Sequence, residues 1–224
     1  MPGTPGAPSA VVGSTGSIVW SWTPAGSATS YELVLASNTS QVLATPTAAS
    51  AALTGFEPNS LSEVVVRGSN TFGPGEFSAQ GSAYSHAAAP VTLAVVSVTT
   101  DTASLSWGSN GNPTGTTYGI EKSTFAGGFV IYSTFTDPSG TVGQLEPGGT
   151  YFFRVLAFND DGVATAYANV VSTLTNANLP GIPGAPVPVV LSTGDIQWSW
   201  TPSARAVNHV IYEVSDLQNP LAVI

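Results

Sequence analysis

The chain has 224 residues, including 24 glycines and 17 prolines, and 42% of the residues are apolar, a balance that favours a folded all-β protein over a disordered chain. The formal net charge is −9 and only four residues are basic, so we expect no nucleic acid partner, because phosphate contacts need clustered Lys and Arg. No apolar run approaches the roughly 20 residues that span a bilayer, so we expect no membrane insertion.

Repeated motifs divide the chain into units. The opening Pro-Gly-Thr-Pro-Gly-Ala-Pro of residues 2–8 returns as Pro-Gly-Ile-Pro-Gly-Ala-Pro at residues 180–186, which lie 178 positions later. The Trp-Ser-Trp-Thr-Pro of residues 20–24 returns at residues 198–202 with the same offset. Two motifs that recur at one offset indicate a duplicated structural unit.

A third unit lies between these two copies. Its Trp107 follows Trp22 by 85 positions and precedes Trp200 by 93. A period near 90 residues is typical of one β-sandwich domain. We therefore expect two complete domains and the N-terminal half of a third, at residues 1–87, 88–176 and 177–224.

In the first unit, short runs of alternating apolar and polar residues predict five strands. They cover residues 17–23, 30–36, 41–44, 64–70 and 75–84. Trp22 closes the first of these runs, and Tyr31 falls on the inward face of the second.

In the second unit, the same reasoning predicts seven strands. They cover residues 91–98, 103–107, 118–123, 130–134, 141–144, 151–159 and 163–174. Four aromatic residues gather around Gly127 and Gly128, namely Phe125, Phe129, Tyr132 and Phe135. We expect these rings to divide between core and edge positions, and a platform that stacks on sugars is the alternative.

The most informative stretch of the second unit runs from 145 to 162. Its central residues alternate in period 2 and predict a strand inside a sheet, because apolar residues occur on both faces. The stretch follows the pattern Leu-x-Pro, then Tyr, then Arg-Val-x-Ala-x-Asn-x-x-Gly. The matching residues are Leu145, Pro147, Tyr151, Arg154, Val155, Ala157, Asn159 and Gly162. This stretch resembles the penultimate strand of a fibronectin type III domain.

The resemblance implies an all-β fold of tandem fibronectin type III, immunoglobulin-like β-sandwiches, two complete and one partial. It implies a structural core that includes Trp22, Trp107, Trp200, Tyr31, Tyr118 and Tyr151. Tyr151 is expected to form a tyrosine corner, in which its hydroxyl bonds to backbone a few residues upstream. Ser62 stands at this position in the first unit, so we expect the corner to be missing there.

The third unit lacks any counterpart of residues 145–174. Half a sandwich cannot bury its inner face, so Trp200 and Ile211 would remain in water, and such a piece should not fold alone. Either the natural chain continues past Ile224, which we favour, or another chain completes the sandwich by strand addition. Proline in the linkers between units should stiffen them.

Candidate catalytic residues are scarce. There is no cysteine, and the only histidines, His86 and His209, are interpreted as structural. No zinc-protease, serine-hydrolase or phosphate-loop motif occurs. Asp160 and Asp161 precede Gly162, and their place in a turn explains them without catalysis or calcium binding. We predict no enzyme, no catalytic or metal residues and no cofactor.

The function that we expect is that of a non-catalytic structural or adhesive repeat module at the cell surface or outside the cell. Low charge and a half-domain favour self-assembly into a filament or layer. The expected partners are proteins, through self-association or neighbouring repeats, with glycans as a further option. The alternative is a spacer in a secreted polysaccharide-degrading enzyme whose catalytic domain lies outside this segment.

Overall fold

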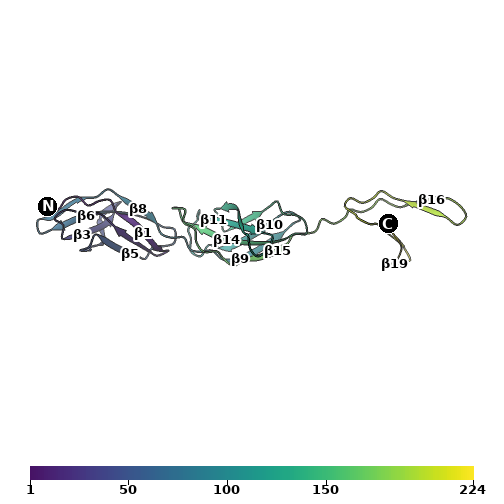
Figure 1. The fold of residues 1–224 in the computed structure, drawn as a ribbon, viewed down its shortest axis with the longest axis horizontal. Helices are drawn as coiled ribbons and strands as arrows, with labels where there is room; N and C mark the ends of the chain where they lie inside the picture. The colour runs from purple at the N-terminus through teal and green to yellow at the C-terminus, as the bar shows by residue number, and fades with distance from the viewer. The chain divides into compact units, whose positions relative to one another are not determined.

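The computed structural model describes every residue from Met1 to Ile224 and consists of 19 strands without a helix (Figure 1). It therefore contains no helix that could cross a membrane. The chain divides into two compact units, Met1–Asn176 and Ala177–Ile224. Met1–Asn176 holds two β-sandwiches, called here the first and the second sandwich. Ala177–Ile224 holds the half-sandwich.

The first sandwich is built from eight strands. They are β1 (Ser9–Ser14), β2 (Ser17–Ser21), β3 (Ser30–Leu35), β4 (Asn38–Ala44), β5 (Ser50–Thr54), β6 (Leu61–Asn70), β7 (Gly73–Phe77) and β8 (Gly81–Tyr84). One sheet has the order β1-β2-β5, and the other has the order β4-β3-β6-β7, with β8 also paired to β6. Trp20 is fully buried between these sheets, and Trp22 meets Tyr31 edge to face at 5.4 Å.

The second sandwich has the seven strands predicted from the sequence. They are β9 (Val91–Val98), β10 (Ala103–Gly108), β11 (Thr117–Ser123), β12 (Val130–Phe135), β13 (Ser139–Val142), β14 (Thr150–Phe158) and β15 (Val171–Leu174). They form sheets of order β13-β10-β9 and β12-β11-β14-β15. Trp107 meets Tyr118 edge to face at 5.5 Å, and Phe153 on β14 is fully buried beside them in the core.

The last strand of each sandwich is shorter than the sequence predicts. The range 75–84 divides into β7 and β8, and of 163–174 only β15 is a strand. In the first sandwich the N–H of Val66 donates to the Ser78 hydroxyl at 3.1 Å. In the second, the N–H of Ala157 donates to the Thr165 hydroxyl at 3.0 Å. Each hydroxyl replaces a backbone acceptor, so the strand leaves the ladder at that residue.

The half-sandwich consists of two hairpins, β16 (Val187–Val190) with β17 (Ile196–Ser199), and β18 (Val210–Glu213) with β19 (Asp216–Val223). Its registers repeat those of the first sandwich at the offset of 178 residues found in the sequence. Val187 pairs with Ser199 as Ser9 pairs with Ser21, and Ile211 pairs with Ala222 as Leu33 pairs with Ala44.

The six residues named above as the structural core differ in burial. Trp22, Trp107, Tyr31, Tyr118 and Tyr151 are buried in the two sandwiches. Trp200 is only half-buried, because the half-sandwich lacks counterparts of β5 to β8, and its ring lies 5.8 Å from that of His209. Trp200 is therefore not part of a closed core.

Candidate functional site: the junction between the two sandwiches

The turn after β14 carries the most concentrated set of polar contacts between the sandwiches. Gly162 has a φ of 79°, a left-handed conformation that suits glycine, and its N–H donates to the carbonyl of Asn159 at 2.8 Å. The closed turn presents Asp160 and Asp161 to the first sandwich. The sequence indicated a turn at these residues, but it gave no sign that they contact another domain.

Asn59 is the residue of the first sandwich that receives this turn. It is 5% exposed and has a φ of 51°, which Asn tolerates better than most residues. Its Nδ2 donates to the carboxylate of Asp160 at 3.1 Å, and its Oδ1 accepts the N–H of Asp160 at 2.8 Å. Its Nδ2 also donates to the hydroxyl of Thr116 at 3.2 Å. One amide side chain thus makes three hydrogen bonds across the junction, two of them reciprocal with one residue.

The same turn holds the backbone of the connecting segment. The carboxylate of Asp161 accepts the N–H of Tyr84 at 2.8 Å. The Nδ2 of Asn159 donates to the carbonyl of Ser85 at 3.2 Å, while its Oδ1 accepts the N–H of Val163 at 2.7 Å. Because Asn159 is 3% exposed, these bonds satisfy polar groups that water does not reach.

A second loop of the second sandwich fixes the rest of the connection. Asn112 is buried and forms a reciprocal pair with the backbone of Ala88, as its Oδ1 accepts the N–H and its Nδ2 donates to the carbonyl, both at 2.7 Å. Asn110 donates to the carbonyl of Ala89 at 2.9 Å. Stiffness of this linker was predicted from proline. In the structure, side-chain amides hold its backbone directly.

The turn that carries Asn59 is itself held by a serine hydroxyl. Ser85 is fully buried, accepts the N–H of Ser60 at 3.0 Å and donates to the carbonyl of Glu57 at 2.7 Å. This hydroxyl supports the turn in the sandwich that has Ser62 in place of the corner tyrosine. The turn before β6 is therefore ordered without a tyrosine corner.

The second sandwich has the same hydroxyl contact and a tyrosine in addition. Thr175 accepts the N–H of Gly149 at 2.9 Å and donates to the carbonyl of Glu146 at 2.6 Å. The Tyr151 hydroxyl accepts the N–H of Glu146 at 2.8 Å, which is the upstream backbone contact expected of a tyrosine corner. Sequence analysis did not identify the roles of Ser85 and Thr175, because single hydroxyl residues at strand ends are too common to signal a contact.

The two histidines belong to different units. His86 lies in the connecting segment, where its carbonyl accepts the N–H of Asn59 at 3.1 Å. In the half-sandwich, the Nε2 of His209 accepts the N–H of Ser203 at 3.1 Å. Both contacts are structural in kind, because each one pairs a backbone group within the fold.

The aromatic residues around Gly127 and Gly128 do not form one platform. Phe135 and Tyr132 lean on the core of the second sandwich, and the Tyr132 hydroxyl accepts the N–H of Gly143 at 3.0 Å. Phe125 is 61% exposed and covers Gly128. The remaining ring, Phe129, lies outside the core against a cation described next.

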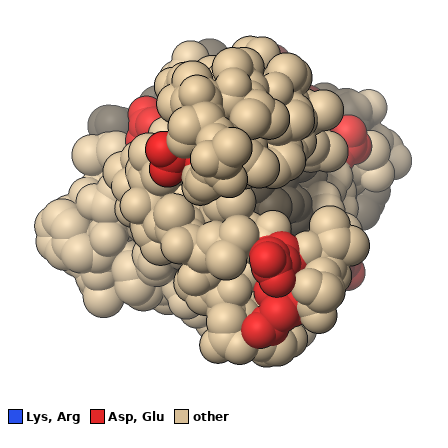
Figure 2. Space-filling model, turned by 90° about the vertical axis from the view of Figure 1, so that its right-hand side faces the viewer, with Lys and Arg blue, Asp and Glu red and all other residues tan.

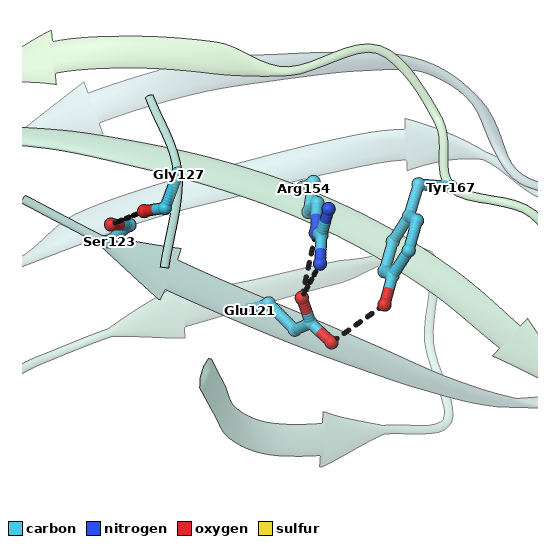
Figure 3. Close-up of polar contacts among 5 residues, drawn as sticks. All are labelled: Glu121, Ser123, Gly127, Arg154 and Tyr167. Carbon is cyan, nitrogen blue, oxygen red and sulfur yellow. Dashed lines mark hydrogen bonds and ion pairs between the residues drawn. The ribbon is translucent and has the colours of Figure 1, made fainter. Parts of the chain in front are cut away.

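Arg154 lies on the outer face of the β11–β14 pair, beside Glu121 and the ring of Tyr167 (Figure 3). Its guanidinium lies 3.7 Å from the Tyr167 ring centroid and 4.3 Å from that of Phe129. Its Nη2 is 2.6 Å from the carboxylate of Glu121, which also accepts the Tyr167 hydroxyl at 2.9 Å. Burial, followed by the bond to Glu121, raises the pKa of Tyr167 above its usual value. The charge of Arg154 is therefore balanced within the cluster by Glu121.

The other basic side chains also have contacts within the protein. Arg67 pairs with Glu32 at 2.7 Å, Lys122 lies 4.8 Å from the Tyr132 ring centroid, and the Nη1 of Arg205 donates to Asn178 at 2.7 Å. Figure 2 shows one face of the molecule, on which acidic side chains occur in separate groups and no basic side chain is visible. The surface therefore offers no cluster of cations to an anionic partner.

Together, these observations define a protein of tandem immunoglobulin-like β-sandwiches whose two complete members are joined by a hydrogen-bonded junction. The family profile for the fibronectin type III domain matches residues 88–173. The second sandwich is therefore a fibronectin type III domain. No curated protein sequence matches the chain at a significant level.

Solved structures with similarity to this chain include fibronectin type III domains. One is the domain of human fibronectin type III domain containing protein 3, with 24% identity, a TM-score of 0.36, and coverage of 41% of this chain and 87% of that chain. Another is a segment of two such domains from chicken tenascin, with 14% identity, a TM-score of 0.46, and coverage of 77% of this chain and 99% of that chain.

Proposed function

We propose that the two complete domains act as a stiff, non-catalytic spacer in a structural or adhesive repeat protein outside the cell or on its surface. The observation that carries this proposal is the three-bond contact of Asn59 with the second sandwich. A flexible string of domains needs no buried side chains at its joints. Here one junction buries Asn59, Asn112 and Asn159, all of them hydrogen-bonded.

The strength of this junction follows from its bonds. Each hydrogen bond contributes about 1 kcal/mol net, and one to a charged group contributes somewhat more. The three bonds of Asn59 therefore favour the closed junction by roughly 3 kcal/mol, or a factor of about 100 in population. Such a bias holds two domains in one arrangement for most of the time, as a spacer of defined length requires.

A location outside the cell is supported by the surface composition. The chain has few charges and a large share of Ser, Thr, Ala and Gly, which suits a surface covered by neighbours or by glycans. Staining of intact source cells with an antibody against the chain tests this part of the proposal. Staining that appears only after the cells are permeabilised would contradict it.

Stiffness is tested by the distance between two spin labels. The chain has no native cysteine, so Gln41→Cys in β4 and Ser172→Cys in β15 place one label on each sandwich at exposed positions. Double electron–electron resonance on the 224-residue chain should give one narrow distance distribution. Asn59→Gly removes the side chain, keeps the left-handed backbone, and should broaden this distribution.

The matched control is Ser27→Gly, another residue with positive φ, at 60°, in a turn of the first sandwich away from the junction. It should leave the distribution unchanged. A distribution that is broad in the unsubstituted chain would refute the proposed spacer function, whatever the variants show.

A further inference from the structure

One asparagine of the two sandwiches has an amide nitrogen that is not used by the fold. Asn38, the first residue of β4, donates no hydrogen bond through its Nδ2 and is exposed, as are the next four residues of the strand. Every other asparagine between Met1 and Asn176 donates through Nδ2 to another residue of the protein. These are Asn59, Asn70, Asn110, Asn112, Asn159, Asn169 and Asn176.

The same asparagine begins a sequence that accepts glycans. Residues 38–40 read Asn-Thr-Ser, which is the Asn-x-Ser/Thr sequon of N-linked glycosylation. Residues 112–114 read Asn-Pro-Thr, but proline in the middle position excludes glycan transfer. Asn112 is also buried, and its Nδ2 is bonded to the carbonyl of Ala88. The sequon that permits transfer therefore coincides with the amide nitrogen that the two sandwiches leave unbonded.

The hairpin tip holds Asn38 through its oxygen. The Oδ1 of Asn38 accepts the N–H of Ser40 at 3.2 Å, which closes an Asx turn. This bond does not involve the amide nitrogen. The Ser40 side chain is exposed and its hydroxyl makes no hydrogen bond within the protein, so both polar groups of the sequon are accessible from solvent.

The turn alone does not explain why the residue is an asparagine. In the half-sandwich, 178 positions later, the Oδ1 of Asp216 accepts the N–H of Gln218 at 3.1 Å. A carboxylate therefore forms the same turn, and Gln218 stands where the first sandwich has Ser40. The amide nitrogen at position 38 and the hydroxyl at position 40 are features that the turn does not require.

The strand that carries Asn38 has room for a bulky group. β4 is the outermost strand of the sheet with the order β4-β3-β6-β7, so a glycan at its first residue displaces no neighbouring strand. Val42 on the same strand is 48% exposed. A glycan beside this edge would also hinder its pairing with a strand of another molecule, since uncovered edges are templates for such pairing.

We propose that Asn38 is a site of N-linked glycosylation. The Nδ2 of Asn38 attacks the anomeric carbon of a glycan carried on a lipid diphosphate, and a C–N bond forms. The bond between that carbon and the diphosphate oxygen breaks, the lipid diphosphate leaves, and Nδ2 loses one proton to solvent. The inference rests on the proposed location outside the cell, because this transfer takes place on the non-cytoplasmic side of a membrane.

The experiment uses the protein isolated from its source cells. Digestion with chymotrypsin yields a peptide that spans residues 36–43, and mass spectrometry with fragmentation identifies any group on Asn38. We expect a glycan on Asn38. The peptide that contains Asn112 is an internal control and should be unmodified.

Three variants made in the same cells test the dependence on the sequon. Ser40→Ala keeps Asn38 and should lower the glycosylated fraction by roughly tenfold or more, whereas Ser40→Thr should retain it. Asn38→Asp should abolish the modification. Because Asp216 shows that a carboxylate forms the same turn, a loss of the glycan in this variant is not caused by a loss of the turn.

An unmodified Asn38 in protein that antibody staining places outside the cell would overturn this inference and leave the proposed location standing. Equal modification of the Ser40→Ala variant would overturn it too, because the modification would then be independent of the sequon. Protein found only inside the cell, with Asn38 unmodified, would refute the location and the glycan together. The spin-label distances test the stiffness of the spacer separately from both.

Discussion

The repeated Trp-Ser-Trp motif allows one substitution to be made in two environments with the same local sequence. Trp20 is fully buried in the first sandwich, and Trp198 is 46% exposed in the half-sandwich. A Trp-to-Ala change in a core costs about 3–5 kcal/mol of unfolding free energy. The indole N–H of Trp20 is buried without an acceptor, and its removal offsets about 1 kcal/mol of that loss. We expect Trp20→Ala to cost about 2–4 kcal/mol.

Trp198→Ala should cost much less. Complete burial of a large apolar side chain contributes about 1.5–3 kcal/mol, and Trp198 gains only about half of that because it stays 46% exposed. No closed cavity forms when it is truncated, so we expect a loss of about 0.8–1.5 kcal/mol. The assay is hydrogen exchange of the full chain in increasing urea, followed by mass spectrometry of peptides from β2, β3 and β6 and from residues 177–224.

Trp198→Ala should leave the exchange of the first sandwich unchanged, since the two residues belong to different units. A loss below about 1 kcal/mol for Trp20→Ala would mean that the ring is not part of the core. An equal loss for both substitutions would show that the local motif, rather than the surrounding sandwich, sets the contribution of its tryptophan. Either result would refute the reasoning.

Three further substitutions test single contacts. Thr175→Val removes two hydrogen bonds at nearly constant shape and should cost about 2–3 kcal/mol, more than the roughly 1 kcal/mol expected for Tyr151→Phe, in urea unfolding of the second sandwich. Gly68→Ala should destabilise the first sandwich by about 1–3 kcal/mol through overpacking, and an unchanged unfolding midpoint would show that its neighbours move freely. The raised pKa of Tyr167 means that the folded state binds its proton more tightly, so the stability from this group is complete below about pH 10 and falls as the pH rises further. Tyr167→Phe should flatten the fall in unfolding free energy between pH 9 and 11, and an identical slope would remove Tyr167 as its cause.

The strands were predictable from the sequence where the pattern is local and regular. The alternation over 151–159 predicted β14 (Thr150–Phe158) to within one residue, because period 2 places Phe153 and Val155 on one buried face. The ends of the last strands were not predictable. Ser78 ends the pairing through its hydroxyl, and a serine in a polar run gives no warning that it does so.

The junction was hidden for a different reason. Asn59 and Asp160 are 101 positions apart, and each lies in a turn where an Asn or Asp is ordinary. Turn preference therefore explains each residue separately and leaves their meeting unpredicted. One signal in the sequence could have pointed to the junction. The turns on either side of the short linker, one in each sandwich, both carry residues with amide or carboxylate side chains. A single sequence does not show which of them pair.

The half-sandwich separates what a β-sequence encodes locally from what it needs from its surroundings. Residues 177–224 reproduce the hairpins and registers of the first sandwich, because turn residues and the alternating pattern act over a few positions. They do not reproduce its burial, as Ile196 and Trp198 show. A hairpin pair with its register set and its apolar face uncovered has already met part of the entropic cost of ordering its strands. The hairpins are therefore encoded locally, whereas the burial of Ile196 and Trp198 depends on counterparts of β5 and β6, the strands that pair with β2 and β3 in the first sandwich.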